Sequence, residues 1–374
     1  MALSLYIQPL STVTGPQAVE ADAIRLGGSM VYANLFALVI RDGGTVISRE
    51  MASAVEMNGA LSDLPGDLVD EGAAQWANLQ KVHAPLQCGD RTIRLDQPQV
   101  MGILNVTPDS FSDGGKFMDD EAAMQEQAAK MHEAGAAILD IGGESTRPGA
   151  AAVWEGDEIE RVVPAIEYCA RMGAAVSVDT RRPPVMQAAV EAGAHIINDV
   201  SALRHDPASL GYGASAGKPV ILMHAPGPSA DAAEKLHDDA NYTSVVFDVF
   251  DWLKERRDAA IAAGVARELI VLDPGIGFGK SVADNLNLMN ALPLFHALGQ
   301  PLLLGASRKR TIGALSNEVA AHQRLGGSLA FAMKGMDAGY HLLRVHDVFE
   351  TVQARNVWRG MRDAALTDFG GLPG

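Results

Sequence analysis

The chain has 374 residues, of which 48% are hydrophobic and 20% charged, an ordinary globular composition that provides for a sizeable buried core. The formal net charge of −16 argues against a nucleic-acid-binding surface, although a local basic pocket is compatible with it. The two cysteines, Cys88 and Cys169, have no metal-binding or Cys-x-x-Cys spacing, so we interpret them as buried thiols in a reducing compartment.

Residues 1–95 have weak hydrophobic periodicity and no catalytic motif. The stretch "VYANLFALVI" (31–40) fits a strand or a short helix, and "VDEGAAQWANLQKVH" (69–83) fits a helix. The first residues lack the basic and apolar segments of a signal peptide, and the apolar runs are too short to span a bilayer, so we expect a soluble, cytoplasmic protein with no membrane partner. We interpret this region as an N-terminal extension of unknown role: a packing layer, an oligomerisation arm or a degenerate domain.

From about residue 97, short apolar runs alternate with Ala- and Leu-rich helical stretches. This alternation predicts parallel strands buried on both faces. Eight such units over roughly 270 residues fit a (β/α)8 TIM barrel, which has about 250 residues. An open doubly wound sheet is the alternative, but it usually has a GxGxxG turn after its first strand, which this chain lacks. We therefore predict an α/β fold with a TIM barrel over residues 96–374. The predicted strands are 99–106, 136–142, 175–179, 195–200, 219–224, 269–275, 301–307 and 341–347, and the predicted helices are 119–135, 156–173, 183–193, 243–264 and 318–336.

Polar residues stand at the end of every predicted strand. In a TIM barrel the C-terminal ends of all strands meet at one face, where active sites lie. An Asp or Asn after a strand is often a turn or helix-cap residue, but capping alone does not explain polar residues at all eight ends. We therefore predict a site at this face. The residues are Asn105, Glu144 and Thr146, Asp179, Asn198 and Asp199, His224, Asp273, Ser307 and Lys309, and Arg344 and His346.

Two groups of these residues suggest ligands. Asp179, Asn198 and Asp273 suit the edge of a polar, nitrogen-rich ring, because a buried carboxylate is costly unless it faces N–H donors. The other group follows the last two strands, where barrels often bind phosphate, and favours an anionic ligand; salt bridges to nearby acids are the alternative. This second group consists of Lys309, Arg310, Arg344 and His346.

Three segments have the composition of functional loops. "TPDSFSDGG" (107–115) and "GGESTRPGA" (142–150) are rich in Gly, Ser, Thr and Pro, as loops that close over a substrate often are. "DPGIGFGK" (273–280) lacks the GxxxxGK[ST] spacing of a phosphate-binding P-loop. We expect its glycines to form a tight turn that carries Phe278 to the rim of the site.

Seven segments in chain order closely resemble the dihydropteroate synthase family, the sulfonamide targets of folate biosynthesis. They are "GILNVTPDSFSDGG", "DIGGESTRPGA", "SVDT", "IINDVSAL", "LDPGIGFGK", "GASRKR" and "RVHD", and the resemblance covers about residues 90–366. It implies a transferase that joins 6-hydroxymethyl-7,8-dihydropterin diphosphate to 4-aminobenzoate and releases diphosphate. It also implies Mg²⁺ as cofactor and a homodimer formed through the outer helices of the barrel.

The resemblance implies a role for each matching residue. Asp179, Asn198 and Asp273 would hold the pterin, with Met223 packed on its ring and Lys309 reaching its oxygen. Asn105 would bind Mg²⁺, and Arg344 and His346 would bind the phosphates. The aminobenzoate pocket would be formed by Thr146, Pro148, Phe111, Phe278, Lys309 and Arg310, and ordered by Asp113 and Arg147. The predicted catalytic residues are Asp273, Lys309, Asp113 and Arg147.

Two departures and two alternatives accompany this prediction. Arg310 stands where some members of the family have Ser, and residues 1–95 lie outside the shared motifs. A pterin-dependent methyltransferase barrel would share the ring-binding residues but would need neither Lys309 nor Asn105. A non-catalytic pterin-binding relative would have been indicated by loss of Asn105, Asp273, Lys309 or His346, all of which are present.

Overall fold

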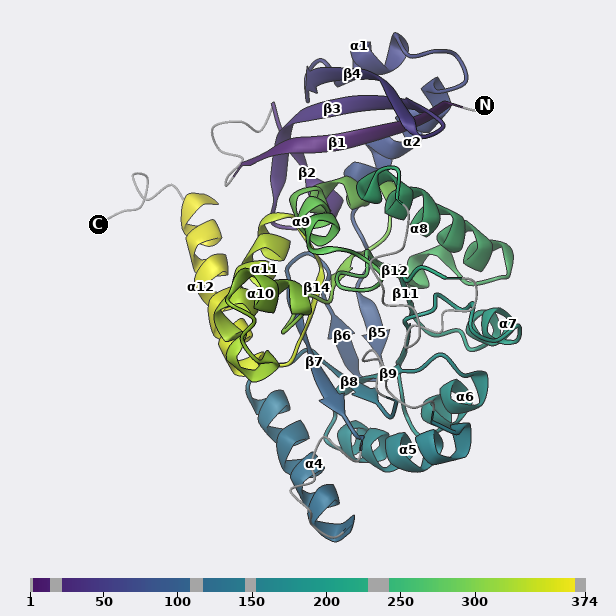
Figure 1. Ribbon diagram of the computed structural model, residues 1–374, viewed down its shortest axis with the longest axis vertical. Helices are drawn as coiled ribbons and strands as arrows, with labels where there is room; N and C mark the ends of the chain where they lie inside the picture. The colour runs from purple at the N-terminus through teal and green to yellow at the C-terminus, as the bar shows by residue number, and fades with distance from the viewer. Residues whose placement is uncertain (1–2, 14–21, 108–116, 145–152, 228–241, 367–374) are drawn as a thin grey trace.

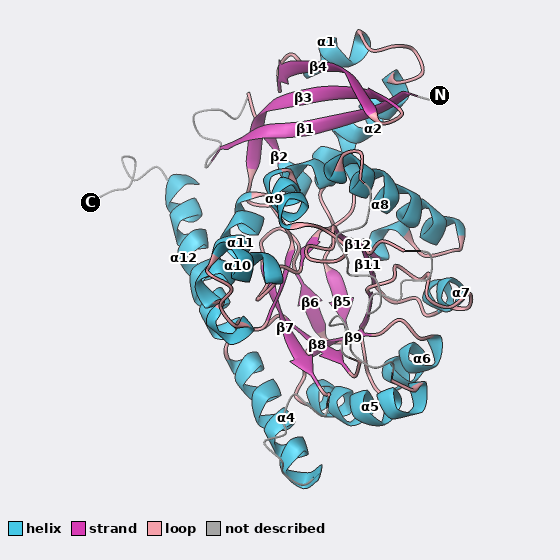
Figure 2. Cartoon of the chain, viewed as in Figure 1, coloured by secondary structure: helices cyan, strands magenta, loops and turns pink. Residues whose placement is uncertain are grey.

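The computed structural model describes residues 3–13, 22–107, 117–144, 153–227 and 242–366. Figure 1 shows a ring of helices around a central barrel, with a second, smaller β-sheet packed against one side of the ring. Figure 2 shows that the strands of the barrel lie inside and the helices outside, as a barrel of alternating strands and helices requires. None of the helices in the described part of the chain combines the length and the hydropathy needed to cross a membrane.

The central barrel consists of eight parallel strands in the order β12-β11-β10-β9-β8-β7-β14-β13. A single bridge between Leu272 and Leu302 joins β12 to the segment that precedes β13, so the ring is nearly closed. The predicted TIM barrel is confirmed. The strands are β7 (Gln99–Asn105), β8 (Ile138–Gly142), β9 (Ala175–Asp179), β10 (Ile196–Asp199), β11 (Val220–Met223), β12 (Ile270–Asp273), β13 (Leu303–Leu304) and β14 (Leu342–Val345).

The outer helices begin and end where the sequence provides caps. Pro183 opens α6, and a capping box between Ser281 and Asp284 opens α9. The helices are α4 (Phe117–Glu133), α5 (Glu155–Arg171), α6 (Pro183–Glu191), α7 (Ser209–Ser215), α8 (Val245–Ala262), α9 (Val282–Asn290), α10 (Arg310–Leu315), α11 (Leu325–Asp337) and α12 (Val348–Leu366). Short 3-10 segments are η2 (Arg267–Leu269), η3 (Leu292–Leu298) and η4 (Ala321–Gln323).

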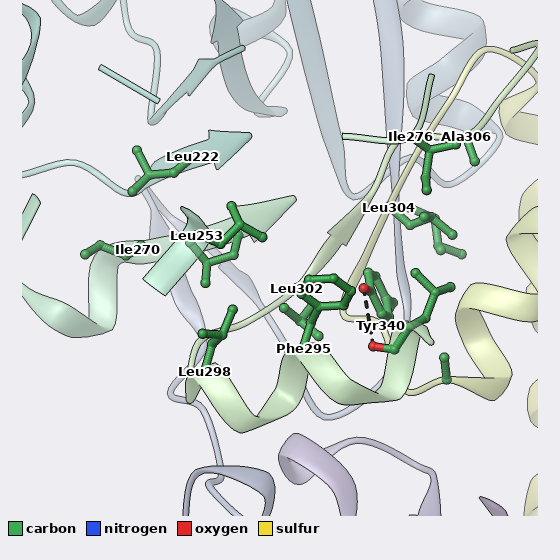
Figure 3. Packing of buried hydrophobic residues seen from close by; sticks show 14 of the residues in the cluster. Leu222, Leu253, Ile270, Ile276, Phe295, Leu298, Leu302, Leu304, Ala306 and Tyr340 are labelled. Atoms are coloured by element: carbon green, nitrogen blue, oxygen red, sulfur yellow. Dashed lines mark hydrogen bonds between the residues drawn. The ribbon is translucent and has the colours of Figure 1, made fainter. Parts of the chain in front are cut away.

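The helices and the barrel wall share one apolar core. In Figure 3, Leu253 of α8 lies near Leu222 and Ile270 of the wall, while Phe295 and Leu298 of η3 lie beside Leu302. All of these side chains are buried. The Tyr340 hydroxyl donates to the backbone oxygen of Leu292 over 3.5 Å, so this large side chain is buried with its polar end bonded.

The N-terminal end of the barrel is closed by a hairpin of β5 (Leu86–Cys88) and β6 (Arg91–Ile93). Leu86, Cys88, Ile93 and the following Leu95 are buried in one cluster with an apolar side chain from each of the eight strands. We call this cluster the floor. The strand residues of the floor are Met101, Ile138, Ala175, Ile196, Ile221, Val271, Leu303 and Leu342.

Residues before the hairpin form an antiparallel sheet. Its central strand is β3 (Tyr32–Asp42), which pairs with β1 (Leu3–Val13) on one side and with β4 (Thr45–Ser53) and the short β2 (Ile24–Arg25) on the other. The stretch 31–40 is therefore a strand, and it is buried along most of its length because neighbouring strands flank it. Segments packed with the sheet are η1 (Leu26–Gly28), α1 (Met57–Ser62) and α2 (Val69–Leu79), the last within the predicted helix 69–83.

The sheet is fixed to the barrel by polar and aromatic contacts with α8. The Tyr6 hydroxyl donates to Asp251 over 2.6 Å, and the Tyr6 ring lies 4.3 Å from that of Phe247 between centroids. Buried Arg41 forms an ion pair with Asp248 at 3.1 Å. The N-terminal region therefore packs on the outer helices at the side of the barrel. It lies away from the C-terminal ends of the strands, where the site is predicted.

Two predicted elements differ from the structure. The strand predicted at 301–307 is only Leu303–Leu304, because Ala306 and Ser307 already belong to the turn that leads to α10. The helix predicted at 318–336 begins at Leu325. Before it, Asn317 and Glu318 have positive φ angles, and the Arg324 side chain donates to the oxygen of Val319, so this segment folds as a compact turn with η4.

Candidate active site

A polar layer lies directly above the floor. Side chains alternate along a strand, so the residue two positions after each floor residue points into the barrel again. Of the predicted site residues, Asn198, Met223, Asp273 and Arg344 all belong to this layer, and Asn105, Asp179 and His346 come one step closer to the open end. The complete layer is Ile103, Asp140, Ser177, Asn198, Met223, Asp273, Gly305 and Arg344.

Arg344 joins two carboxylates inside the barrel. Its Nε donates to Asp140 Oδ2 over 2.6 Å, and its Nη2 donates to Asp179 Oδ2 over 2.6 Å. Asn198 Nδ2 also donates to Asp140 Oδ2, over 3.2 Å. Arg344 belongs to the basic group for which salt bridges to nearby acids were the alternative to an anionic ligand, and it does form such salt bridges. Burial raises the pKa of the Asp179 carboxyl, and the positive charge of Arg344 opposes that shift.

Asp140 is a site residue that sequence reasoning missed. It lies in the middle of β8 and is fully buried, and one of its oxygens, Oδ1, has no hydrogen-bond partner within the described residues. The same is true of the buried Ser177 hydroxyl in the next strand. Polar atoms buried without partners are costly, so these two atoms indicate a place for hydrogen-bonding groups of a ligand. The signal in the sequence was an Asp inside an otherwise apolar strand, "ILDIG".

Asp273 ends β12 and turns the chain into the next loop. Its Oδ1 accepts a hydrogen bond from Gly275 N over 2.7 Å, and its side chain is 4% exposed. Burial raises the pKa of Asp273 to about 6, against the opposing effects of the Gly275 bond and of Lys309. The predicted ring-binding residues Asp179, Asn198 and Asp273 thus lie on neighbouring or nearly neighbouring strands of one wall.

Lys309 and Phe278 meet across two loops. Lys309 Nζ lies 4.0 Å from the centroid of the Phe278 ring, a cation–π contact. Phe278 is buried with Val200, Met223 and Ala225, so its side chain packs with residues at the C-terminal ends of β10 and β11 and is not exposed. Burial lowers the pKa of Lys309 to about 8. The neighbouring Arg310 is exposed at the first position of α10.

The loop that follows β14 is bonded to the loop that follows β13. His346 Nδ1 and Ser307 Oγ are 3.1 Å apart, and Arg308, which has a φ of 56°, pairs with Asp347 through both its Nε and Nη2. Burial lowers the pKa of His346 to about 3. The ring is therefore neutral at pH 7, and a ligand phosphate would meet it as a hydrogen-bonding group.

Three polar strand-end residues have structural roles. Asp199 accepts from the backbone N–H groups of Ser201 and Leu203, and Glu144 pairs with both Arg181 and Arg182. His224 lies behind the site, where its ring accepts from a buried lysine. The turn explanation therefore holds for Asp199, while Glu144 forms ion pairs and His224 binds a lysine.

Asn105 is the predicted Mg²⁺ ligand. It ends β7 at the open face, and its Oδ1 lies on one side of Gly142 with Asp179 Oδ2 on the other. A Cβ at position 142 would stand 3.5 Å and 3.8 Å from these two oxygens, so the glycine leaves the space between them open. Amide and carboxylate oxygens are ligands that Mg²⁺ accepts, usually one or two of them together with substrate phosphates. Within the described residues, no cluster of three or more His, Cys, Asp or Glu side chains could hold a metal by itself.

Five predicted site residues lie outside the described part of the chain. They are Phe111, Asp113, Thr146, Arg147 and Pro148, all in the segments that follow β7 and β8.

Comparisons with known proteins agree with this geometry. The family model described as "Pterin binding enzyme" matches residues 101–346, from β7 through the end of β14. Dihydropteroate synthase from Escherichia coli K12 is 45% identical over 267 residues, which are 71% of this chain and 92% of the relative. The Bacillus subtilis enzyme is 43% identical over 272 residues, which are 72% of this chain and 90% of the relative. The chain belongs to the dihydropteroate synthase family.

Solved structures of dihydropteroate synthases have the same fold. The Xanthomonas albilineans enzyme with 4-aminobenzoic acid has a TM-score of 0.69 and 45% identity, and the match covers 78% of this chain and all of that one. The same enzyme in complex with 7,8-dihydropteroate has a TM-score of 0.67 and 43% identity, covering 77% of this chain and all of that one. The Yersinia pestis enzyme in complex with a sulfonamide drug has a TM-score of 0.69 and 42% identity, covering 75% and 99%.

Proposed function

We propose that this dihydropteroate synthase family member joins 6-hydroxymethyl-7,8-dihydropterin diphosphate to 4-aminobenzoate, releasing diphosphate and forming 7,8-dihydropteroate. The polar layer above the floor carries this proposal. It offers carboxylate and amide groups to a ring rich in N–H donors, and two of its buried polar atoms, Asp140 Oδ1 and Ser177 Oγ, have no partner within the described residues.

The pterin would lie against the wall formed by β9 to β12. We propose that Asp179, Asn198 and Asp273 bind its polar edge and that Met223 packs on its face, as their positions in successive strands allow. Lys309, whose ammonium group lies over Phe278, would reach the ring oxygen. The deepest part of the barrel would thus hold the pterin, because the floor beneath this layer is apolar.

The reaction needs no side-chain nucleophile. When the C–O bond to the diphosphate breaks, the positive charge on the exocyclic carbon is delocalised into the dihydropterin ring. Asp273 and Asp179 stabilise that charge, and preorganised carboxylates do so without the cost of reorienting solvent. The amino group of 4-aminobenzoate then forms the C–N bond and loses a proton, which balances the step.

The departing diphosphate needs positive charge and hydrogen-bond donors. We propose that His346 and Arg344 contact its phosphates; the two carboxylates use two of the five N–H donors of the guanidinium. Asn105 would hold Mg²⁺ at the open face. Bound there, the ion would neutralise charge on the leaving diphosphate.

The second substrate would bind nearer the mouth. Phe278 and Lys309 would form the inner side of the aminobenzoate pocket, and Arg310 lies next to it at the start of α10. The contributions of Phe111, Asp113, Thr146, Arg147 and Pro148 to this pocket stay predictions.

A second copy of the chain is the proposed protein partner. Phe349, Val357 and Met361 of α12 are 63%, 59% and 58% exposed. They are spaced by eight and four residues, so they fall on one side of the helix. We propose that this face contacts a second barrel in a homodimer. Light scattering would show a dimer for the wild type and a monomer for Val357→Glu; a monomeric wild type would exclude the proposal. The cytoplasmic location expected from the sequence stays a prediction.

The central test is a turnover assay with both substrates and Mg²⁺ in which dihydropteroate and diphosphate are followed together, with Lys309→Ala as a comparison. Equal formation of both products, lost in the variant and on removal of Mg²⁺, is the expected result. Release of diphosphate alone would show that ionisation occurs and the second pocket is altered. Tight pterin binding with neither product would instead support a methyltransferase or a non-catalytic pterin-binding protein.

A further inference from the structure

Lys280 is buried inside the turn that carries Phe278. Its side chain is 8% exposed, and its Nζ lies 2.8 Å from Gly275 O and 3.0 Å from Phe278 O. The same atom lies 2.8 Å from Nδ1 of His224. An ammonium group has three donors, and these three acceptors, together with the more distant backbone oxygen of His224 at 3.5 Å, occupy all of them.

The turn presses closely on the end of β11. Gly275 and Gly279 have φ angles of 68° and 56°, in the left-handed region that favours glycine. A Cβ at Gly275 would stand 2.0 Å from the backbone oxygen of His224, and one at Gly279 would stand 2.0 Å from a side-chain carbon of Pro226. The backbone therefore leaves no room for a side chain between the turn and the strand, and Lys280 links the two from within.

Lys280 bonds to the backbone of the turn at Phe278 and just before it. Its Nζ binds the carbonyl of Phe278 itself and that of Gly275, while Asn285 Oδ1 accepts from Gly277 N over 2.6 Å. The backbone on which the Phe278 ring stands is thus fixed by two side chains. The ring in turn lies 4.0 Å from Lys309 Nζ, and the Lys309 stem packs close to Gly277, where a Cβ would approach it to 2.9 Å.

This chain of contacts separates Lys280 from the reacting groups by one residue. Its acceptors are two backbone carbonyls of the turn and the ring and backbone oxygen of His224, and no side chain of the polar layer is among these acceptors. Removing it would leave the carbonyl of Phe278 without this donor and that of Gly275 with the Phe278 N–H, at 3.2 Å, in its place, and the turn would shift. Such a shift would move Phe278 first and Lys309 through it.

We propose that Lys280 is a positioning residue that holds the Phe278 ring, and through it Lys309, in the geometry that receives the second substrate. The inference rests on the proposed function, in which Phe278 and Lys309 form the inner side of the aminobenzoate pocket. The pterin-binding residues Asn198 and Asp179 lie on strands that Lys280 does not contact, so pterin binding depends on Lys280 less than aminobenzoate binding does, although Lys309 contributes to both.

The test is a comparison of steady-state constants for wild type, Lys280→Met and the milder Lys280→Gln, which keeps a donor for one of the acceptors. We expect the KM for 4-aminobenzoate to rise about tenfold in Lys280→Met, with a smaller rise in Lys280→Gln, and the KM for the pterin diphosphate to rise less than that for 4-aminobenzoate because Asn198 and Asp179 keep their positions. Arg257→Met is the matched control: it removes a buried cation that donates to the oxygen of Leu298, far from the site, and should leave both constants unchanged.

A second measurement keeps the test decisive. If Lys280 acts through Phe278, its substitution should have little further effect in a Phe278→Leu background, so the two changes will not be additive. Full additivity, or equal rises in both KM values, would overturn the positioning role. Absence of turnover in the wild type would refute the proposed function instead, so the two failures are distinguishable. If Lys280→Met does not fold, Lys280→Gln and its cycle with Phe278→Leu decide the question.

Discussion

Arg344 Nη2 donates to Asp179 Oδ2 over 2.6 Å and so links the last strand of the barrel to its third. The same guanidinium binds Asp140, which is fully buried. Without Arg344, the buried carboxylates of Asp140 and Asp179 would face each other without the cation that now pairs with both. The ion pair is therefore as much a condition for the fold of the polar layer as a part of the site.

Arg344→Met should lower the free energy of unfolding by about 3 kcal/mol at pH 7, the usual cost of leaving buried charges uncompensated. The loss should be smaller at pH 5, because Asp179, whose pKa is raised by burial, can then take up a proton. Urea denaturation measures both values. Arg359→Met, which removes an exposed ion pair with Asp363, is the control; equal losses in the two variants would contradict the prediction.

Ser177→Ala should weaken binding of the pterin without weakening the fold. The Ser177 hydroxyl is buried without a partner in the described residues, so its removal costs no hydrogen bond in the free protein. Its loss in the complex should raise the Kd of the pterin diphosphate about tenfold. Calorimetric titration and thermal unfolding provide the two readouts.

Ser328→Ala is the matched control for this prediction. Ser328 is also buried, but its hydroxyl accepts from Arg308 N over 2.9 Å and donates to Arg324 O over 2.7 Å. This variant should lose stability. A destabilised Ser177→Ala protein with unchanged pterin affinity would show that the unpartnered hydroxyl is not a ligand group.

The rate should depend on pH through Asp273 and Lys309. The pKa of Asp273 is raised to about 6 by burial, and the carboxylate is needed in its charged form, so kcat/KM should fall as the pH drops through that value. The pKa of Lys309 is lowered to about 8, so loss of the ammonium charge should reduce the rate as the pH rises through that value. A profile of kcat/KM against pH between 5 and 10 should be bell-shaped. In Lys309→Arg, residual activity should lose the alkaline limb, since a guanidinium stays charged; a limb that persists would exclude Lys309 as its source.

The joint between the N-terminal sheet and the barrel should weaken in acid. His341 donates from Nε2 to the oxygen of Gly27 and accepts at Nδ1 from Leu302 N, both over 2.9 Å, and the His296 ring lies 5.6 Å from it between centroids. The bond accepted at Nδ1 requires the neutral ring, because both ring nitrogens of a protonated histidine are donors. Burial lowers the pKa of His341 to about 4 and that of His296 to about 3.

The sign of this effect follows from the unfolded state, in which a histidine has a pKa of about 6.5. The stabilisation is fully present above that pH and is lost progressively as the pH falls toward the folded-state values, because the unfolded chain then binds more protons. The free energy of unfolding should therefore decline between about pH 6.5 and pH 4. His341→Gln should be less stable at pH 7 and show a shallower decline; a slope equal to that of wild type would assign the acid sensitivity to other groups.

Local patterns predicted most of the barrel. The strand predicted at 175–179 has the same bounds in the structure, and the helix predicted at 183–193 begins at the same proline. Periodicity and caps are properties of neighbouring residues, so they can be read from the chain directly. The seventh strand and the start of α11 were misjudged because positive-φ residues such as Arg308 and Glu318, which have no glycine to signal them, turn the chain there.

The residues of the site could be predicted from the sequence better than the contacts that they form with each other. Nothing near Arg344 in the sequence indicates that its partners are Asp140 and Asp179, because the three residues meet only when the barrel closes. Lys280 was read as part of a loop motif, and its burial against His224 depends on the close approach of two strands. Asp140 was hidden by its position inside an apolar run, although an acidic residue inside an apolar strand is itself a sign of function.

The hairpin of β5 and β6 beneath the barrel affects the order in which substrates bind and products leave. With apolar side chains from all eight strands and from β5 and β6 closing one end, the described part of the barrel opens at the C-terminal ends of the strands. Two molecules that enter the barrel by the same opening cannot pass each other. The molecule that binds deepest must therefore enter first and leave last. The pterin diphosphate would then have to enter before the aminobenzoate, and diphosphate would have to leave by the route the aminobenzoate came in. The hairpin, which touches no substrate, would thereby set the sequence of events in each turnover.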